Sequence, residues 1–406
     1  MKLLVLSNGH GEDRVAVRII EQLQIITNLE LAALPIVGQG YAYSKSKIAI
    51  AGRVQQMPSG GFIYKGGNPL WQDLRGGLVR LTLEQIEVVR RWGREGGVIL
   101  AVGDIVPLLY AWSSKANYAF VGTARSDYYL RNEEGWLSQT SWIERKIGSV
   151  YMPWERWLMS RNACKGVFPR DSLTAEILRR RSIRAYDLGN PMMDGISASV
   201  EPSSPDTLNI LLLPGSRTPE ALRNWKLILD GVSQTIQTCQ SRQLNFKLNF
   251  ISAIAPALDL QPFVRQAQDK QWQAIKQESP TAILVKNNIS LTLSQNSYAR
   301  FLQQADIAIA MAGTATEEFV GLGKPAIIMP GSGPQFTYAF AEAQSRLLGC
   351  SIAMVENPNK IPPAILQIIN NPQQLEQIAN NGKRRMGEAG AALRIARCLK
   401  KTLLAK

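Results

Sequence analysis

The sequence predicts an α/β protein with two domains, each built on a parallel sheet. At 406 residues the chain is longer than one hydrophobic core usually serves, so two domains of nearly 200 residues are expected. Segments 1–23, 208–226 and 305–322 each have the pattern of an apolar strand, a glycine-containing turn and a helix. A further strand follows the third helix, which makes a crossover between parallel strands.

Residues 305–346 contain the clearest of these units. The run IAIAM predicts a short buried strand, and it leads into a turn at Gly313. Thr314 is expected as the N-cap of the following helix, and Glu317 would complete a capping box. Gly323 marks the helix end, and residues 325–330 predict the next strand.

The Gly313 turn has the features of a phosphate-binding site. Backbone N–H groups at the start of a helix, together with its dipole, favour an anion such as a diphosphate. Because Glu317 is committed to the cap, Glu318 is the acid left to accept hydrogen bonds from a ribose. The alternative is that both acids merely complement the helix dipole.

A second glycine turn lies about 100 residues earlier. Gly215 and Ser216 follow the apolar run ILLLP and form the turn, and Thr218 is expected as the N-cap with Pro219 at the first helical position. Arg217 is then held at the mouth of a helix N-terminus, where its guanidinium suits a diphosphate.

The first strand leads into a loop that holds His10, the only histidine. Gly9 and Gly11 flank it, so a substrate can approach the backbone closely. The pattern GxGxxG fails because Arg14 stands at its last position, which argues against a dinucleotide. His10 is a candidate general base. The alternative is a loop histidine that hydrogen-bonds its neighbours.

Asp104 follows Gly103 in the stretch GGVILAVGD at 96–104, which predicts a buried strand. It lies at the carboxyl end of that strand, where functional groups of α/β proteins collect. Asp104 is therefore a second candidate for the general base, acting either in place of His10 or together with it. The alternative is a helix N-cap.

The stretch AGTATEEFVGLGKP at 312–325, a Pro-Gly loop and PQFTYAFAEAQ together resemble the nucleotide-sugar site of GT-B glycosyltransferases. The likeness is to lipid-A-disaccharide synthase and, more distantly, to the peptidoglycan N-acetylglucosaminyltransferase. It implies that Glu318 contacts the ribose, Arg217 the diphosphate and Gln335 the donor. It also implies a catalytic role for Asp104. The expected donor-binding set is Gly215, Ser216, Arg217, Gly313, Thr314, Ala315, Glu318 and Gln335.

The resemblance covers most of the chain and implies the GT-B fold, two Rossmann-like doubly wound parallel-sheet domains facing across a cleft. The expected acceptor-binding domain spans 1–200, and 201–207 form a Pro/Ser-rich linker. The nucleotide-sugar domain is expected at 208–375. A basic helical tail at 376–406 would pack back on the first domain or lie on anionic lipid.

The implied reaction is hexosyl transfer from a UDP-sugar to a lipid or lipid-linked acceptor, with inversion. His10 or Asp104 takes the acceptor proton, and the two glycine turns stabilise the leaving UDP. No Asp-x-Asp pair is placed to hold a metal, so no metal or other cofactor is expected. The first domain departs from lipid-A-disaccharide synthase, because its histidine loop is similar to that of the peptidoglycan enzyme.

A formal net charge of +14 predicts an anionic partner. Residues 57–77 mix aromatic, apolar and basic side chains in a Gly-rich loop, which suits an acceptor or an anionic membrane surface. A surface loop with buried aromatic anchors is equally consistent. The acceptor and membrane candidates are Gly9, Gly11, Phe62, Tyr64, Lys65 and Trp71.

Seven of the nine tryptophans lie in the first 157 residues, which fits either an interfacial surface or a core. The start of the chain lacks the long apolar run of a signal peptide, and the four cysteines have no ligand-like spacing. We therefore expect a cytoplasmic protein, peripherally associated with the inner face of a membrane.

Two other functions remain open. A non-hydrolysing UDP-sugar epimerase would share the fold and the phosphate turn, but it would not need an aromatic, basic first domain. A nucleic-acid-binding protein would explain the charge, yet the chain lacks an RNA-recognition signature, so nucleic acid is not expected as a partner.

Overall fold

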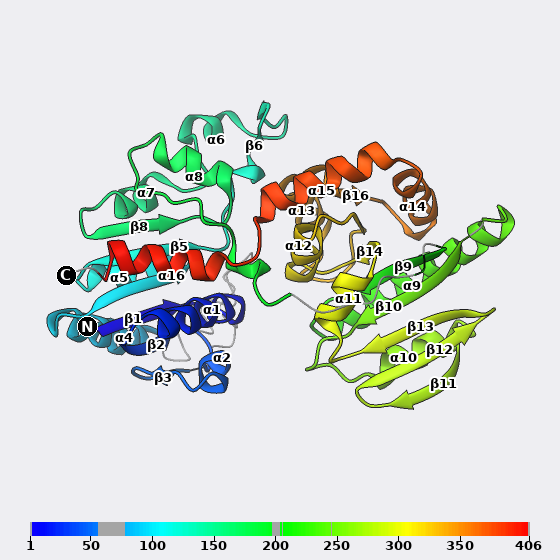
Figure 1. Cartoon of the computed structure of the whole chain (residues 1–406), viewed down its shortest axis with the longest axis horizontal. Helices are drawn as coiled ribbons and strands as arrows, with labels where there is room; N and C mark the ends of the chain where they lie inside the picture. The colour runs from blue at the N-terminus through cyan, green and yellow to red at the C-terminus, as the bar shows by residue number, and fades with distance from the viewer. Residues whose placement is uncertain (1, 56–77, 197–203, 205, 245, 405–406) are drawn as a thin grey trace. The chain divides into compact units, whose positions relative to one another are not determined.

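The computed structural model describes residues 2–55, 78–196, 204, 206–244 and 246–404 (Figure 1). The chain divides into two compact units. The first comprises Met1–Asp194 with Gly387–Lys406, and the second comprises Gly195–Met386. The predicted linker 201–207 lies mostly outside the described residues, and its last residue already begins strand β9. The unit boundaries therefore fall at 194/195 and 386/387.

The first unit is built on a six-stranded sheet in the order β3-β2-β1-β4-β5-β8, with every pair parallel. This is the strand order of a Rossmann fold. The strand order reverses between β1 and β4, so the helices that follow these two neighbouring strands lie on opposite faces of the sheet. The strands are β1 (Lys2–Ser7), β2 (Glu30–Pro35), β3 (Ala49–Ile50), β4 (Val98–Gly103), β5 (Tyr118–Gly122) and β8 (Cys164–Phe168).

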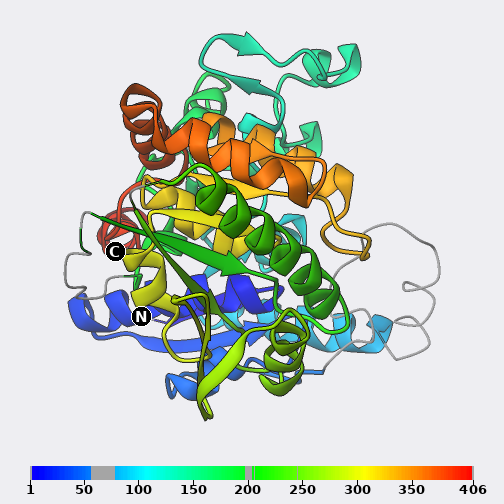
Figure 2. The ribbon, with the colours of Figure 1, turned by 90° about the vertical axis from the view of Figure 1, so that its right-hand side faces the viewer.

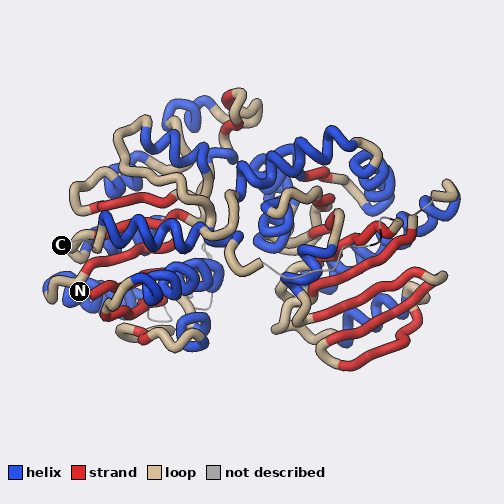
Figure 3. The backbone as a smooth tube through the Cα atoms, in the orientation of Figure 1, coloured by secondary structure: helices blue, strands red, loops and turns tan. Residues whose placement is uncertain are grey.

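Helices cover both faces of this sheet (Figure 3). One core packs α1 and α16 against it, and the other packs α4, α5 and α7. The helices are α1 (His10–Ile26), α2 (Tyr41–Lys45), α4 (Leu78–Arg94), α5 (Ile105–Ser113), α6 (Trp142–Ile147), α7 (Pro153–Met159), α8 (Ser172–Arg179) and α16 (Ala391–Thr402). A short hairpin, β6 (Arg131–Asn132) and β7 (Gly135–Trp136), stands apart from the sheet.

Helix α16 returns to the first unit after the whole second unit has been traced. In Figure 1 it is the red helix among the blue and cyan elements. Ile395 and Leu399 are fully buried in the core that α1 contributes to. The Asp194 carboxylate fixes the helix start by accepting hydrogen bonds from the N–H groups of Ala391 at 3.1 Å and Ala392 at 2.7 Å. The basic residues of α16 therefore lie on a helix whose apolar face is already occupied.

The second unit is built on an eight-stranded sheet in the order β11-β12-β13-β10-β9-β14-β15-β16. Strand β9 pairs in parallel with both β10 and β14, and here the order reverses. The strands are β9 (Thr207–Leu213), β10 (Lys247–Ala253), β11 (Gln273–Glu278), β12 (Thr281–Lys286), β13 (Ile289–Ser294), β14 (Ile307–Ala310), β15 (Ala326–Ile328) and β16 (Ile352–Met354).

The helices of the second unit cover this sheet, and Figure 2 looks onto the unit with α9 running across it. They are α9 (Glu220–Ser241), α10 (Gln261–Asp269), α11 (Tyr298–Gln304), α12 (Thr314–Gly321), α13 (Tyr338–Leu348), α14 (Ile361–Ile369) and α15 (Pro372–Met386). Lys324 holds the end of α11, because its ammonium donates to the carbonyl oxygens of Leu302, Gln303 and Ala305 at 2.9, 2.5 and 2.6 Å.

Both predicted helix caps at the glycine turns are wrong. Gly313 is the N-cap of α12, and Thr314 is the first helical residue. The 316 and 317 N–H groups bond to the Gly313 carbonyl oxygen, so the capping box is not formed. In the other turn Pro219 is the N-cap, and α9 begins at Glu220 instead of at Pro219. In each case a backbone turn replaces the expected side-chain cap.

Candidate active site

In the first unit, two predicted catalytic residues follow the neighbouring strands between which the order reverses. His10 comes after β1 and Asp104 after β4, and these strands pair directly. A crevice outside the carboxyl ends of such a strand pair is the usual ligand site of a doubly wound sheet. The structure thus places the two residues at the same edge of one sheet.

Asn8 joins the two loops. Its side-chain amide donates to Asp104 Oδ1 at 2.7 Å. The same oxygen accepts from the Val106 N–H at 2.8 Å, so Asp104 is also the N-cap of α5. Gly103 has φ of +133°, and a Cβ there would lie 2.1 Å from Asn8 Oδ1. Only glycine lets the loops approach this closely. Sequence reasoning missed Asn8.

His10 is exposed and is the first residue of α1, with Gly9 as N-cap. It lies on the helix end instead of in the loop that the sequence suggested. Gly9 is buried, and Gly11 lies in the first turn with open space where a Cβ would stand. The histidine is therefore presented at the edge of the unit by a helix terminus.

Glu12 is a further carboxyl at this edge that sequence reasoning missed. Thr123, after β5, contacts its Oε1 at 3.5 Å, and Gly103 packs against its side chain. Burial raises the pKa of Glu12, and the nearby Asp104 charge adds to this, while His10 acts in the opposite direction. Three titratable groups from two loops therefore share this edge. The signal available in the sequence was the position of Glu12 in the first helical turn.

A buried polar relay lies beneath the same loop. Tyr43 Oη and Ser7 Oγ are 2.5 Å apart, and Ser7 Oγ donates to Asp13 Oδ1 at 2.6 Å. Because the single serine proton goes to the carboxylate, the tyrosine donates to the serine. Burial raises the pKa of Asp13 from 3.8 to about 6. The relay fixes the first turn of α1, and so the position of His10.

We expect the first unit to lose stability as the pH rises from about 4 to about 7. A folded pKa above the unfolded one means that the folded state holds the Asp13 proton more tightly, so stability is greatest at low pH and falls through pH 6. A shift of this size corresponds to about 3 kcal/mol. Urea unfolding at several pH values should show this fall. Asp13→Asn should reduce its slope without abolishing it, because burial also raises the pKa of Asp127 to about 6. An Asp269→Asn control, at an exposed acid, should leave the slope unchanged.

In the second unit, the two glycine turns lie side by side. Gly215 follows β9 and Gly313 follows β14, and the Met311 N–H donates to the Leu213 carbonyl oxygen at 2.8 Å. A Cβ on Gly215, where φ is +101°, would lie 3.3 Å from the Met311 carbonyl oxygen. The turns therefore flank the point where this sheet, too, reverses its strand order.

Gln344, a residue that sequence reasoning missed, positions the Gly313 turn. Its buried side-chain amide donates to the carbonyl oxygens of Ala312 at 3.2 Å and Gly313 at 3.1 Å. Thr314 is exposed and Ala315 half-buried at the start of α12. The first N–H groups of a helix lack acceptors within it, so this end of α12 is suited to an anion.

The other turn presents Ser216 and Arg217, both exposed, ahead of α9. Glu220, the first residue of α9, is buried and accepts hydrogen bonds from the N–H groups of Phe336 at 2.7 Å and Gln335 at 3.1 Å. Gly333 lies directly over this carboxylate, where a Cβ would approach within 2.3 Å. The loop that carries the predicted Gln335 is thus attached to the start of α9.

Glu318 is buried, with 2% of its surface exposed, and its Oε2 accepts a hydrogen bond from the Tyr298 hydroxyl. The sequence analysis expected the Glu318 carboxylate to be left for a ribose, but here it also binds a side chain of the protein. Tyr298 begins α11, twenty positions earlier, and no pattern in the sequence connects the two. The tyrosine aligns the carboxylate at the same end of the sheet as the glycine turns.

The remaining predictions fall outside these two clusters. Phe62, Tyr64, Lys65 and Trp71 lie outside the described residues. Within the described part of the chain, no group of three or more His, Cys, Asp and Glu side chains is arranged to hold a metal ion, and metal independence stays a prediction. No described helix has both the length and the apolar character needed to cross a bilayer. All four cysteines are among the described residues, and no disulfide joins them.

No protein-family model and no curated protein matches this sequence. Solved structures do match. The chain aligns over 98% of its length, at 14% identity and a TM-score of 0.57, with 99% of MurG from Acinetobacter baumannii. It aligns over 99%, at 14% identity and a TM-score of 0.54, with all of the UDP-GlcNAc 2-epimerase from Neisseria meningitidis in its complex with UDP-GlcNAc. The spinosyn rhamnosyltransferase SpnG aligns over the full length of both chains at 12% identity and a TM-score of 0.51.

These likenesses and the two reversed strand orders define the class. The chain has the GT-B fold, with two Rossmann-like α/β domains, as the sequence predicted. The likeness at this level of identity is to the fold alone.

Proposed function

We propose that the protein is a glycosyltransferase that moves a hexose from a UDP-sugar to a hydroxyl of a lipid or lipid-linked acceptor, at the cytoplasmic surface of a membrane. The observation that carries the proposal is the adjacency of the Gly215 and Gly313 turns at the reversal point of the second sheet. Two turns that present helix N-termini and an exposed Arg217 side by side suit a diphosphate. The solved complex of the Neisseria epimerase with UDP-GlcNAc is consistent with such a donor.

In this reaction the acceptor oxygen attacks the anomeric carbon, and the bond from that carbon to the diphosphate breaks. The UDP leaves with the electron pair, and the two turns with Arg217 stabilise its charge. His10 or Asp104 takes the acceptor proton, and the configuration inverts. No metal or other cofactor is assigned a role. Sequence resemblance to lipid-A-disaccharide synthase supports a lipid acceptor.

UDP binding tests the donor half of the proposal. We expect Glu318→Ala to weaken UDP binding by roughly 10- to 100-fold, since a hydrogen bond to a charged group is worth about 1.5–3 kcal/mol. Isothermal titration calorimetry with UDP measures this directly. Glu317→Ala, at the neighbouring acid, is the matched control and should change the affinity by less than about threefold. Unchanged affinity in Glu318→Ala would remove Glu318 from the site.

A UDP-sugar 2-epimerase is the second candidate, and the structural likeness to UDP-GlcNAc 2-epimerases favours it. The two activities differ in their need for an acceptor. The protein incubated with UDP-GlcNAc alone should release UDP slowly if it is a transferase, and should produce the epimer if it is an epimerase. Proton NMR of the anomeric region distinguishes the products.

A further inference from the structure

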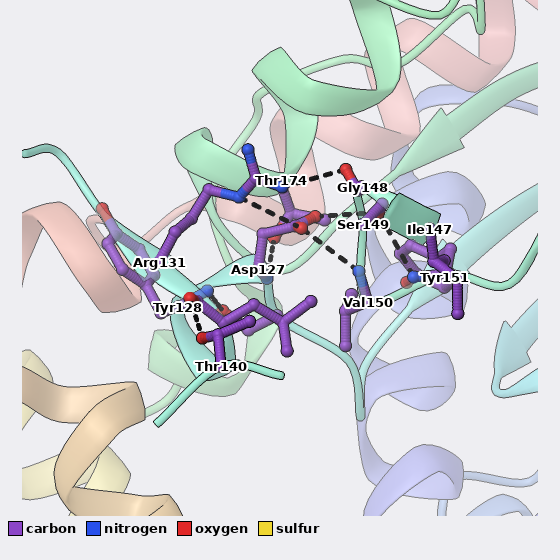
Figure 4. Close-up of polar contacts among 12 residues, drawn as sticks. Asp127, Tyr128, Arg131, Thr140, Ile147, Gly148, Ser149, Val150, Tyr151 and Thr174 are labelled. Atoms are coloured by element: carbon purple, nitrogen blue, oxygen red, sulfur yellow. Dashed lines mark hydrogen bonds and ion pairs between the residues drawn. The ribbon is translucent and has the colours of Figure 1, made fainter. Parts of the chain in front are cut away.

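Three arginines of the first unit converge on the end of α6. The guanidinium groups of Arg131, Arg156 and Arg181 donate to the carbonyl oxygens of Ile147 and Gly148 over distances of 2.9–3.3 Å. Figure 4 shows Arg131 reaching the Gly148 carbonyl from the neighbouring hairpin. Gly148 has φ of +76°, and a Cβ there would lie 2.1 Å from Arg181 Nη2. The glycine at position 148 therefore leaves room for the three guanidinium groups to lie close together.

Two buried acids lie beside the cluster, and one of them, Asp127, has its Oδ1 3.9 Å from the Arg131 guanidinium. Asp127 is fully buried and accepts from the Ser149 hydroxyl and the Val150 N–H, both at 3.1 Å, on the Arg131 side of the cluster (Figure 4). Glu155 is buried, and its Oε2 accepts from the Met152 N–H at 2.8 Å. Its other oxygen lies 3.4 Å from the Arg125 guanidinium.

Excess positive charge remains between Arg156 and Arg181. Burial lowers the pKa of Arg156 and the proximity of Arg181 lowers it further, while Asp127 and Glu155 act in the opposite direction. Glu176, the acid nearest in sequence, forms an ion pair with Arg180. An anionic ligand between the two guanidinium groups would relieve this repulsion.

A pocket opens at this position. It has a volume of about 240 Å³ and is lined by Pro153, Arg156, Trp157, Ser160, Arg181 and Ile183. A volume of this size admits several water molecules or a phosphate group. The two guanidinium groups are suitable donors for phosphate oxygens, whereas the Ser160 hydroxyl donates to the Trp157 carbonyl oxygen at 2.9 Å.

Exposed tryptophans lie at and beside the pocket: Trp157 lines it, Trp112 contacts the Trp157 ring, and Trp154 is on the same helix. Trp154 and Trp157 on α7 are 60% and 46% exposed, and Trp112 on α5 is 42% exposed. The Trp112 and Trp157 rings meet edge to face, 5.6 Å apart, and the Arg161 guanidinium lies 4.4 Å from the Trp157 ring centre. Exposed aromatic rings with cationic groups beside them are typical of surfaces that sit at the headgroup level of a bilayer.

We propose that this pocket binds the headgroup phosphate of an anionic phospholipid, while Trp112, Trp154 and Trp157 enter the interfacial layer of the bilayer. None of the residues that line the pocket is among those proposed for catalysis or donor binding. Helices α5 and α7 both run away from the carboxyl edge of the sheet. Trp112 and Ser160, near the ends of these helices, therefore lie toward its amino edge. Charge complementarity favours a lipid surface, because the protein carries a net charge of +14.

Vesicle binding tests the site without any sugar donor or acceptor, so its outcome is independent of the proposed transferase activity. Binding of the full chain is measured by flotation with phosphatidylcholine vesicles, with and without phosphatidylglycerol. We expect binding only to the anionic vesicles. The double variant Arg156→Gln/Arg181→Gln should bind at least tenfold more weakly, because each basic residue near an anionic surface contributes about a factor of five.

The matched control is Arg242→Gln/Arg265→Gln, which removes the same charge from exposed positions on the second unit. It should bind within about threefold of the unchanged protein. Trp154→Ala, at an exposed side chain that leaves the arginines in place, should also weaken binding and checks against misfolding of the double variant. Equal loss in the control pair, equal binding to neutral vesicles, or full binding by both pocket variants would overturn the proposal. Inorganic phosphate at millimolar concentration provides a further check. If it suppresses vesicle binding, and if the protein binds phosphate in solution at that same concentration, the pocket is a site for a free anion instead.

Discussion

The His10→Ala variant is expected to bind UDP normally but to transfer the sugar at least ~100-fold more slowly, the range lost with a general base. His10 is exposed at the first turn of α1, on a different unit from the glycine turns, so its removal leaves the donor contacts untouched. Single-turnover assays with UDP-sugar and a lipid acceptor measure the rate, and calorimetry measures UDP affinity.

Asp104→Asn is the comparison for this experiment. Asparagine is an equally good N-cap, so the hydrogen bond to the Val106 N–H and the start of α5 are preserved while the charge is removed. If His10 is the base, Asp104→Asn should retain more activity than His10→Ala. Full activity in His10→Ala would assign the role to Asp104, and a loss in both would make them partners.

The second large effect concerns α16. We expect Ile395→Ala combined with Leu399→Ala to destabilise the first unit by about 6 kcal/mol, since each buried aliphatic truncation costs about 2–5 kcal/mol. Both side chains are fully buried against the core that includes α1. A loss of this size is comparable with the whole stability of many domains. Hydrogen exchange resolved by peptide should show loss of protection in β1 and α1.

Lys401→Ala, at an exposed position of the same helix, is the control and should cost less than about 0.5 kcal/mol. The second unit should keep its protection in both variants, because α16 belongs to the first. Unchanged protection of α1 in the double variant would show that α16 contributes little to this core.

Local patterns predicted β9 and β14 correctly, because each is a short buried apolar run that leads into a glycine turn. Residues 282–291 read as one apolar run in the sequence. They form most of a hairpin, β12 and β13, that turns at Asn287 and Asn288, where φ is 52° and 62°. Asparagine tolerates this conformation, so the turn signal was present, but the apolar run on each side concealed it.

The candidate site shows a clearer limit. Each glycine turn was predictable from its own few residues, yet the groups that hold the turns come from distant segments. Glu220 reaches the N–H groups of residues 335 and 336, and Tyr298 reaches Glu318 from another helix. Such partners depend on which strands are neighbours in the sheet. A single sequence carries no local pattern for that.

The return of α16 has a consequence for the order of events during synthesis. The residues that complete the core of the first unit leave the ribosome only after all of the second unit has been made. A domain that is translated first usually folds first. Here the amino-terminal sheet lacks one covering helix throughout that interval, so the later domain can reach its native state before the earlier one does.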